Sequence, residues 1–312
     1  INCKITEIPK DIKNLVNLKI FSIWNNSLTE LPNEISNLTK LEELHISCNS
    51  VKYLPKDIYK LINLKILNIN WCENLKRIPK DIVNLVNLQE LLIGCGKLKN
   101  LPKEINRLTK LKKLKIRCKN LKYIPKGIWN LVNLKELEIR CDKLKKCDKE
   151  LFNLINLERL DISWCKKLKY IPKEIGDLVN LEKLNIEWCE NLKYIPKEIG
   201  NLINLKELYI KDCENLKEVP KEISNLKRLK DITITCRDKI KIPDEVKKLI
   251  ETKSQYINLN NVYSAKELEA ELSDLIKFEI EDDYIFEDSN ILDYIKSVNI
   301  SKNNSVDCYD KI

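Results

Sequence analysis

Twelve cysteines and one histidine are the side chains of this 312-residue chain that could act as nucleophiles or hold a transition metal. A nucleophilic cysteine needs a neighbouring base, and a zinc site needs four ligands at short local spacing. The chain has no Cys-x-x-Cys motif, His45 is its single histidine, and its five glycines form no phosphate-binding loop. The sequence therefore predicts a protein that is not an enzyme and needs no cofactor or metal.

Most of the cysteines share one slot of a repeated unit, which Asn26 occupies in the first full unit. The ten members of this slot are Cys3, Cys48, Cys72, Cys95, Cys118, Cys141, Cys165, Cys189, Cys213 and Cys236. We interpret them as a ladder of buried, reduced thiols, which indicates a reducing, cytoplasmic location. Disulfides between neighbours are the alternative, but they would strain every unit. Cys147 replaces a core isoleucine, and Cys308 lies in a C-terminal region without a histidine base.

All prolines fall on one phase of the repeat, at steps of 23 or 24 residues with a single step of 47. The ten are Pro9, Pro32, Pro55, Pro79, Pro102, Pro125, Pro172, Pro196, Pro220 and Pro243. Asp148 stands in the long gap, where a proline is due. A period this regular predicts a stacked array of identical supersecondary units.

Each unit joins two apolar patterns, as residues 64–88 illustrate. Leu64-x-x-Leu67-x-Ile69 alternates with a period of two, which predicts a short strand. Residues 78–88 place apolar side chains three and four apart, which predicts a short helix with proline at its first position. Stacking buries both apolar faces and places parallel strands on a concave side. Ten leucines begin the strands of ten units, after a partial first unit: Leu18, Leu41, Leu64, Leu88, Leu111, Leu134, Leu157, Leu181, Leu205 and Leu229.

This pattern resembles the leucine-rich repeats, in particular the cytosolic kind with Ile/Leu-Pro-x-x-Ile-x-x-Leu outer segments. Similar repeats occur in Ras-binding scaffolds, plant resistance receptors, and repeat proteins of bacteria and giant viruses. The resemblance covers about residues 1–250. It implies an α/β solenoid, a right-handed horseshoe with a parallel concave sheet, short helices on the convex side and a small helical C-terminal segment. It names no partner, because the family serves many functions.

We expect two regions: residues 1–253 form the repeat domain, and residues 254–312 form an acidic, partly helical cap or tail. Residues 1–243 hold 48 Lys/Arg and 31 Asp/Glu, a balance of +17, whereas residues 244–312 hold 8 and 16, a balance of −8. We consider two roles for residues 254–312. The tail would cover the last repeat, or its acidic stretch 279–288 would block the basic cluster of the repeats. Ile1 falls within a repeat and the chain has no methionine, so we expect the natural chain to continue upstream.

The side chains between the inward-facing strand residues vary from unit to unit, so a partner would read this face. A basic cluster and exposed aromatic residues there resemble a binding hot region. The candidate partner-binding residues on the concave face are Lys113, Lys115, Arg117, Arg140, Trp164, Trp188, Tyr209 and Lys211. The plainer alternative is that the tryptophans cover strand ends and the cations are ordinary solubilising surface.

The sequence thus favours a non-catalytic scaffold that binds a protein partner, which the basic cluster would allow to be acidic. A second hypothesis is the recognition part of a larger adaptor, a ubiquitin-ligase subunit or receptor, whose effector region lies upstream. Nucleic-acid or acidic-ligand binding is a distant third, because many lysines recur beside a row of Asp and Glu and no groove of stacking aromatics is evident. Membrane binding is not expected, since no apolar run approaches the ~20 residues of a span.

Overall fold

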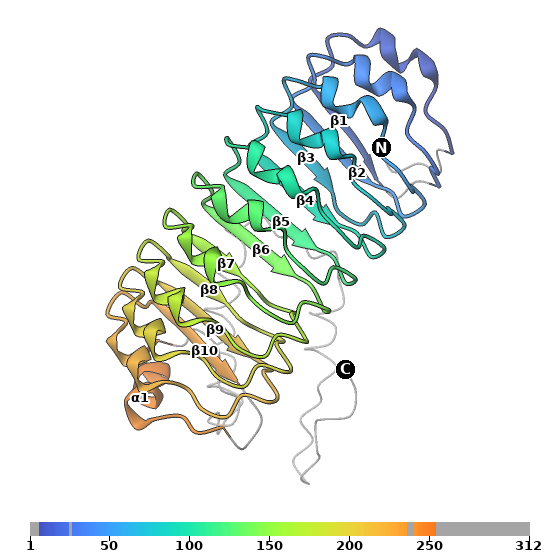
Figure 1. The fold of residues 1–312 in the computed structure, drawn as a ribbon. Helices are drawn as coiled ribbons and strands as arrows, with labels where there is room; N and C mark the ends of the chain where they lie inside the picture. The colour runs from blue at the N-terminus through green and yellow to red at the C-terminus, as the bar shows by residue number, and fades with distance from the viewer. Residues whose placement is uncertain (1–5, 25–26, 236–239, 254–312) are drawn as a thin grey trace, which may run out of the picture. The chain divides into compact units, whose positions relative to one another are not determined.

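The computed structural model describes residues 6–24, 27–235 and 240–253, which contain one ten-stranded parallel sheet with the strands in chain order (Figure 1). The strands are β1 (Ile20–Trp24), β2 (Glu43–Ser47), β3 (Ile66–Ile69), β4 (Glu90–Gly94), β5 (Lys113–Arg117), β6 (Glu136–Arg140), β7 (Arg159–Asp161), β8 (Lys183–Asn185), β9 (Glu207–Lys211) and β10 (Asp231–Thr235). Equivalent positions pair across the sheet, as Leu114 does with Leu137. The prediction of a parallel sheet with one strand per unit is confirmed.

The short helices between the strands are 3-10 helices of five residues each. They are η1 (Lys10–Asn14), η2 (Asn33–Asn37), η3 (Lys56–Lys60), η4 (Lys80–Asn84), η5 (Lys103–Arg107), η6 (Lys126–Asn130), η7 (Lys149–Asn153), η8 (Lys173–Asp177), η9 (Lys197–Asn201) and η10 (Lys221–Asn225). Each begins one residue after the repeat proline, so the prediction that proline is the first helical residue was wrong by one position. The prolines keep an extended backbone, as Pro79 does with φ −55° and ψ 136°, and this makes them caps.

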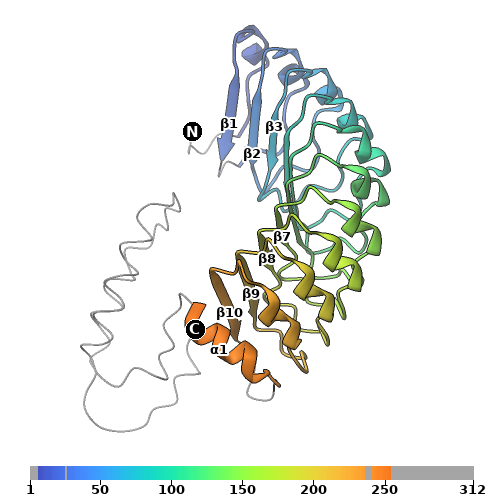
Figure 2. The ribbon, with the colours of Figure 1, turned by 90° about the vertical axis from the view of Figure 1, so that its left-hand side faces the viewer.

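The strands and the 3-10 helices form two layers with the core between them. Figure 2 shows the strands along the inner side of the repeat array and the 3-10 helices along its outer side. Alternate strand residues, such as Leu114 and Ile116 of β5, are completely buried, and Ile128 of η6 meets them from the opposite layer. The period-two and helical patterns of the sequence each supply one wall of this core.

Asparagine side chains tie successive outer turns together, a role that the sequence reading did not assign. Nδ2 of Asn63 donates to the carbonyl of Thr39 at 2.8 Å, one unit earlier. Further bonds of this kind join Asn87 to Ile62, Asn133 to Thr109, Asn156 to Val132, Asn180 to Ile155 and Asn204 to Val179. The recurrent Asn therefore satisfies a carbonyl that the 3-10 helix leaves without a backbone donor.

The predicted burial of the cysteine ladder is confirmed for its eight members within the described residues, and Cys147, outside the slot, is buried as well. In the repeat slot, each thiol lies within hydrogen-bond reach of a strand isoleucine carbonyl of the preceding unit. Cys48 Sγ lies 3.8 Å from the Ile23 oxygen, and Cys165 Sγ lies 3.1 Å from the Ile139 oxygen. A cysteine in this slot thus fills core volume and offers a weak donor to a buried backbone acceptor.

Four units carry one extra residue before the cysteine, and this residue adopts the left-handed conformation. The four are Trp71, Trp164, Trp188 and Asp212, with φ of 60°, 58°, 57° and 51°. The strands before the three tryptophans are only three or four residues long, because a left-handed residue turns the chain out of the ladder. The thiol also comes closer to its carbonyl, at 3.1–3.3 Å against 3.6–3.8 Å in units without the insertion.

The ladder predicts that the nine buried thiols resist alkylation in the folded protein. Burial raises the pKa of Cys72 to about 11 and that of Cys165 to about 12, so little reactive thiolate forms at these two positions at pH 8. The hydrogen bond with Cys95 lowers the pKa of Cys118, and there burial alone excludes the reagent. Brief iodoacetamide treatment followed by peptide mass spectrometry is expected to leave these nine unmodified until guanidinium chloride unfolds the chain. Native-state labelling of any of them at the rate of a free cysteine would contradict the prediction.

The last described element is the α-helix α1 (Asp244–Lys253), which follows the repeat unit of β10 and η10. Its Val246 is completely buried, and the helix packs against β10 and η10. The expected fold class, including a helix at the C-terminal end of the repeats, is therefore confirmed. The tail from residue 254 lies outside the described residues, so its role as cap or blocker stays a prediction.

Candidate functional site: the strand face

We call the outward-pointing side of β1 to β10, together with the residues between each strand and the repeat cysteine that follows it, the strand face. All eight candidate residues belong to it. Lys113, Lys115 and Arg117 lie on β5, and Arg140 ends β6. The remaining four lie further along the array: Trp164, Trp188, Tyr209 and Lys211. The structure thus separates them into a charged group on β5 to β7 and an aromatic group beyond it.

The lysines of the charged group are paired with carboxylates of adjacent strands. Lys113 Nζ lies 3.9 Å from Glu90 and 3.5 Å from Glu136. Lys115 Nζ lies 2.9 Å from Glu136 and 3.4 Å from Glu138. These pairs follow from the parallel register, which places equivalent positions of neighbouring units opposite each other.

Glu138 is the centre of the group, and it is only 3% exposed. Arg117 forms a bidentate hydrogen bond with the Glu138 carboxylate: Nε donates to one oxygen, and Nη2 donates to the other at 3.0 Å. Arg140 Nε lies 2.8 Å from the same carboxylate, and Arg140 Nη2 donates to Asp161 at 2.6 Å. Burial by itself raises the pKa of Glu138, but the hydrogen bond from Arg117 and the surrounding positive charges outweigh it and lower the pKa.

The charged group is therefore a network of alternating charges. Its four cations face the carboxylates of Glu136, Glu138 and Asp161, with Glu90 at its edge. The carboxylates therefore cancel most of the positive potential that the sequence predicted for this cluster. The role of these four cations in binding a partner stays a prediction, and in the structure they pair with carboxylates of β6, β7 and the neighbouring β4.

The aromatic group is built on the left-handed insertions. The rings of Trp164 and Trp188 stack with centroids 4.9 Å apart and planes 14° from parallel. Each residue remains 39% exposed, so the pair presents indole surface to solvent. Lys166 Nζ lies 5.8 Å from the Trp164 ring, within cation–π range. The sequence placed these two tryptophans at equivalent positions, and the structure shows that they form one surface feature.

The Tyr209 side chain lies next to two carboxylates and a lysine. Its hydroxyl lies 2.7 Å from Asp231 and 3.1 Å from Glu207, while Lys183 Nζ lies 5.0 Å from its ring centroid. Burial and then the hydrogen bond with Asp231 raise the pKa of this hydroxyl, so Tyr209 is neutral at physiological pH. Lys211 forms an ion pair with Glu187 at 3.3 Å. Tyr209 and Lys211 are thus positioned by their neighbours on the sheet.

The carboxylates of the charge network are the residues that the sequence reading left out of the site. The signal that could have found them is opposite charge at equivalent slots of neighbouring units, such as Lys115 against Glu138. His45 is paired at 3.2 Å with Glu43 of its own strand. Within the described ranges, no three His, Cys, Asp or Glu side chains gather as metal ligands would, and no helix there has the length and apolar character of a membrane span.

Comparison with known proteins places the chain in a family. The family model described as a leucine-rich repeat region matches residues 1–75 and 48–170, more than half of the chain. The chain therefore belongs to the leucine-rich-repeat proteins. Their fold commonly serves as a protein–protein interaction scaffold. A comparison with curated proteins found no match.

Solved structures agree with this assignment. A leucine-rich-repeat protein of Leptospira interrogans is 30% identical, with 79% of this chain and 73% of that chain covered and a TM-score of 0.49. An internalin of Listeria monocytogenes is 20% identical, with 80% and 69% covered and a TM-score of 0.62. The leucine-rich-repeat domain of the type III effector XopL is 24% identical, with 73% and 80% covered and a TM-score of 0.63. The last two show the solenoid fold itself.

Proposed function

We propose that this chain is a non-catalytic scaffold that binds a partner protein on its strand face. The observation that carries the proposal is the exposed stack of Trp164 and Trp188, two large aromatic side chains held on strained backbone. A bulky residue with positive φ costs stability, and such strain is concentrated at functional sites. Stacked indoles also give a partner a broad apolar surface whose side chains need little further ordering.

The surroundings of the stack suit protein recognition. The parallel sheet fixes the backbone from which the side chains of the strand face project, so no backbone entropy has to be lost on binding. One protein with this fold, the Arabidopsis receptor kinase HAESA, was solved with a peptide hormone and a co-receptor; it is 19% identical with a TM-score of 0.52, and this chain spans 48% of it. Its complex supports a protein or peptide partner here by analogy of fold.

We also propose that the protein works in a reducing compartment such as the cytoplasm. Buried cysteines such as Cys72, Cys141 and Cys165, which form no disulfide, support this location, since an oxidising compartment favours disulfide formation. We also propose that the partner is acidic. This part of the proposal depends only on the cations at the edge of the charge network, because most charges inside the network are already paired.

Replacing both Trp164 and Trp188 with alanine is expected to weaken partner binding by about 30-fold or more, as for a hot spot of about 2 kcal/mol. The partner would first be isolated from the source organism with the tagged chain, and the dissociation constant would then be measured by isothermal titration calorimetry. Trp71→Ala is the matched control, because Trp71 has the same left-handed backbone but lies four units before Trp164. Unchanged affinity of the double variant would contradict the proposed face.

A further inference from the structure

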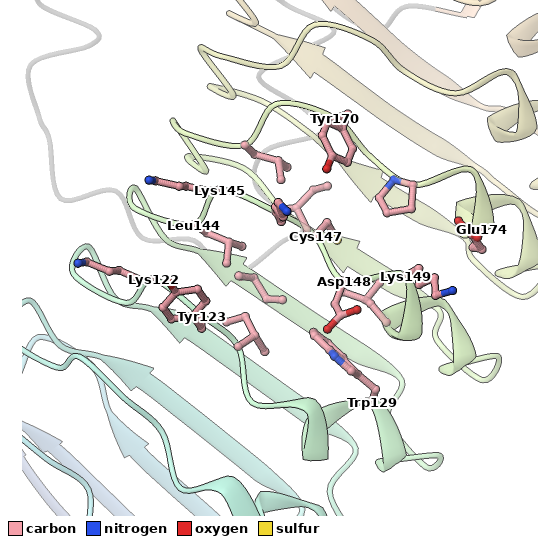
Figure 3. A pocket seen from close by; sticks show the side chains of 17 residues that line it. Lys122, Tyr123, Trp129, Leu144, Lys145, Cys147, Asp148, Lys149, Tyr170 and Glu174 are labelled. Carbon is pink, nitrogen blue, oxygen red and sulfur yellow. The ribbon is translucent and has the colours of Figure 1, made fainter.

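One hollow in the side of the repeat array lies at the interruption of the proline series, and another lies between Pro55 and Pro79, where the series is intact. Cys147 and Asp148 stand where neighbouring units have Ile124-Pro125 and Ile171-Pro172. Asp148 keeps the extended backbone of the prolines, with φ −74° and ψ 135°, so the exchange alters side-chain volume and leaves the chain path unchanged. The short, unbranched cysteine leaves room that an isoleucine would fill. A pocket of about 660 Å³ opens at this position (Figure 3).

The floor of the hollow is apolar and its two sides are aromatic. Ile139, Ile162 and Leu168 of the core line it, and each is almost completely buried. Tyr123 and Tyr170 lie on opposite sides of the hollow in Figure 3. They belong to units two steps apart, which corresponds to roughly 10 Å at the strand spacing of a sheet. A flat apolar group fits between such walls and would cover the exposed rings of Tyr123 and Tyr170.

The charges around the hollow are unequal in number and position. Four lysines line it against two carboxylates: Lys122, Lys145, Lys146 and Lys149 against Asp148 and Glu174. Figure 3 shows Lys122 and Lys145 at one edge, and Asp148 beside Trp129 at the opposite edge. The lysine edge would therefore attract a negative group at one end of a bound molecule.

The carboxyl edge is already engaged with the protein. Glu150, two residues after Asp148, lies 3.8 Å from Lys126. Burial, followed by the hydrogen bond with Glu150, raises the pKa of Asp148. A bound anionic group would therefore lie at the lysine edge, away from these carboxyl groups.

We propose that this hollow is a binding site for an amphipathic organic anion, whose planar apolar body lies between Tyr123 and Tyr170 and whose carboxylate, sulfonate or phosphate group meets the lysine edge. The site is separate from the proposed strand face and does not depend on partner binding. Its size is in the range of pockets that hold small organic ligands.

The test uses a matched pair of fluorescent probes. 1-Anilinonaphthalene-8-sulfonate has a planar apolar body with one anionic group, and N-phenyl-1-naphthylamine has the same body without the charge. Titration of the full chain with the sulfonate is expected to give saturable binding at one site, at least tenfold tighter than binding of the neutral probe. Equal affinities for the two probes, or binding without saturation, would overturn the proposal.

Variants then locate the site. Cys147→Ile together with Asp148→Pro restores the repeat and fills the hollow, and is expected to weaken sulfonate binding at least tenfold. Val219→Ile is the control, because it adds a methylene in the same slot before Pro220 and should leave binding unchanged. Circular dichroism would verify folding of each variant. Tyr123→Ala provides a second variant at a residue that is 77% exposed, and it should also weaken binding. Sulfonate affinity that survives both changes would place the probe elsewhere.

Discussion

Glu138→Ala is expected to lower the free energy of unfolding by about 3 kcal/mol, the lower end of the range for breaking a buried ion pair. The change leaves Lys115, Arg117 and Arg140 facing one another in a site that water reaches only in part. The lower end applies because the two arginine side chains are about one-third exposed and can be partly rehydrated. Urea unfolding followed by circular dichroism measures the effect.

The control for this prediction is Glu158→Ala on the same sheet. Glu158 pairs with Lys135 at 2.6 Å, but both side chains are exposed, so the loss should stay below about 1 kcal/mol. Equal effects of the two substitutions would show that the network contributes no more than an ordinary surface pair. Glu138→Gln keeps the shape of the side chain and should give an intermediate loss.

The carboxylate of Glu138 also makes the free energy of unfolding depend on pH. Because the pKa of Glu138 is lower in the folded state, its stabilising contribution is complete above the unfolded value of about 4.3 and is lost as the pH falls through the folded value. The difference in unfolding free energy between the natural protein and Glu138→Gln should therefore shrink as the pH drops from 6 towards 3. A difference that stays constant over this interval would contradict the assigned pKa direction.

Leu137→Ala is expected to cost about 2–5 kcal/mol, because it opens a cavity in the fully buried centre of β6. Leu137 lies between Leu114 and Leu160 in the register of the sheet, so both interfaces of its unit lose contacts. In a linear array each unit contacts only its neighbours, and a weak central unit can separate the unfolding of the two halves. Urea unfolding should therefore show a second transition or a broadened one.

Val132→Ala tests whether the effect of Leu137→Ala depends on burial. Val132 lies just before this unit, at the end of the preceding one, and is 57% exposed, so its truncation should change the unfolding free energy by less than about 0.5 kcal/mol. A single sharp transition for Leu137→Ala, shifted as a whole, would mean that the array unfolds as one cooperative block.

The repeat itself made most of the fold predictable. The fixed spacing of leucines and prolines locates each strand and each 3-10 helix, and it sets the register that brings Leu114 opposite Leu137. The helix start differed by one residue because proline fixes φ but leaves ψ open, and here ψ is extended. The framework contacts between neighbouring units can be predicted from one unit alone, because the same contacts recur at each step along the array.

The candidate site was less predictable, because its side chains depart from the repeat. The sequence identifies Lys115 and Arg117 as a basic cluster, yet their burial and pairing depend on Glu138 and Asp161 in neighbouring units. Stacking of Trp164 on Trp188 depends on a left-handed backbone at both, and an inserted residue can be accommodated in several ways. Pairing and backbone conformation arise from contacts between units, which the pattern of a single unit does not specify.

The asparagine and cysteine bonds between successive units have a consequence for how such a chain can change in length. Most units offer to the next one the same carbonyls that they use from the unit before, as Thr39 does for Asn63. Gene duplication or loss of one whole period therefore joins surfaces that already fit, whereas an insertion of a single residue must be absorbed locally, as it is at Trp188. The strand face can thus lengthen or shorten in steps of one unit while the core stays unchanged.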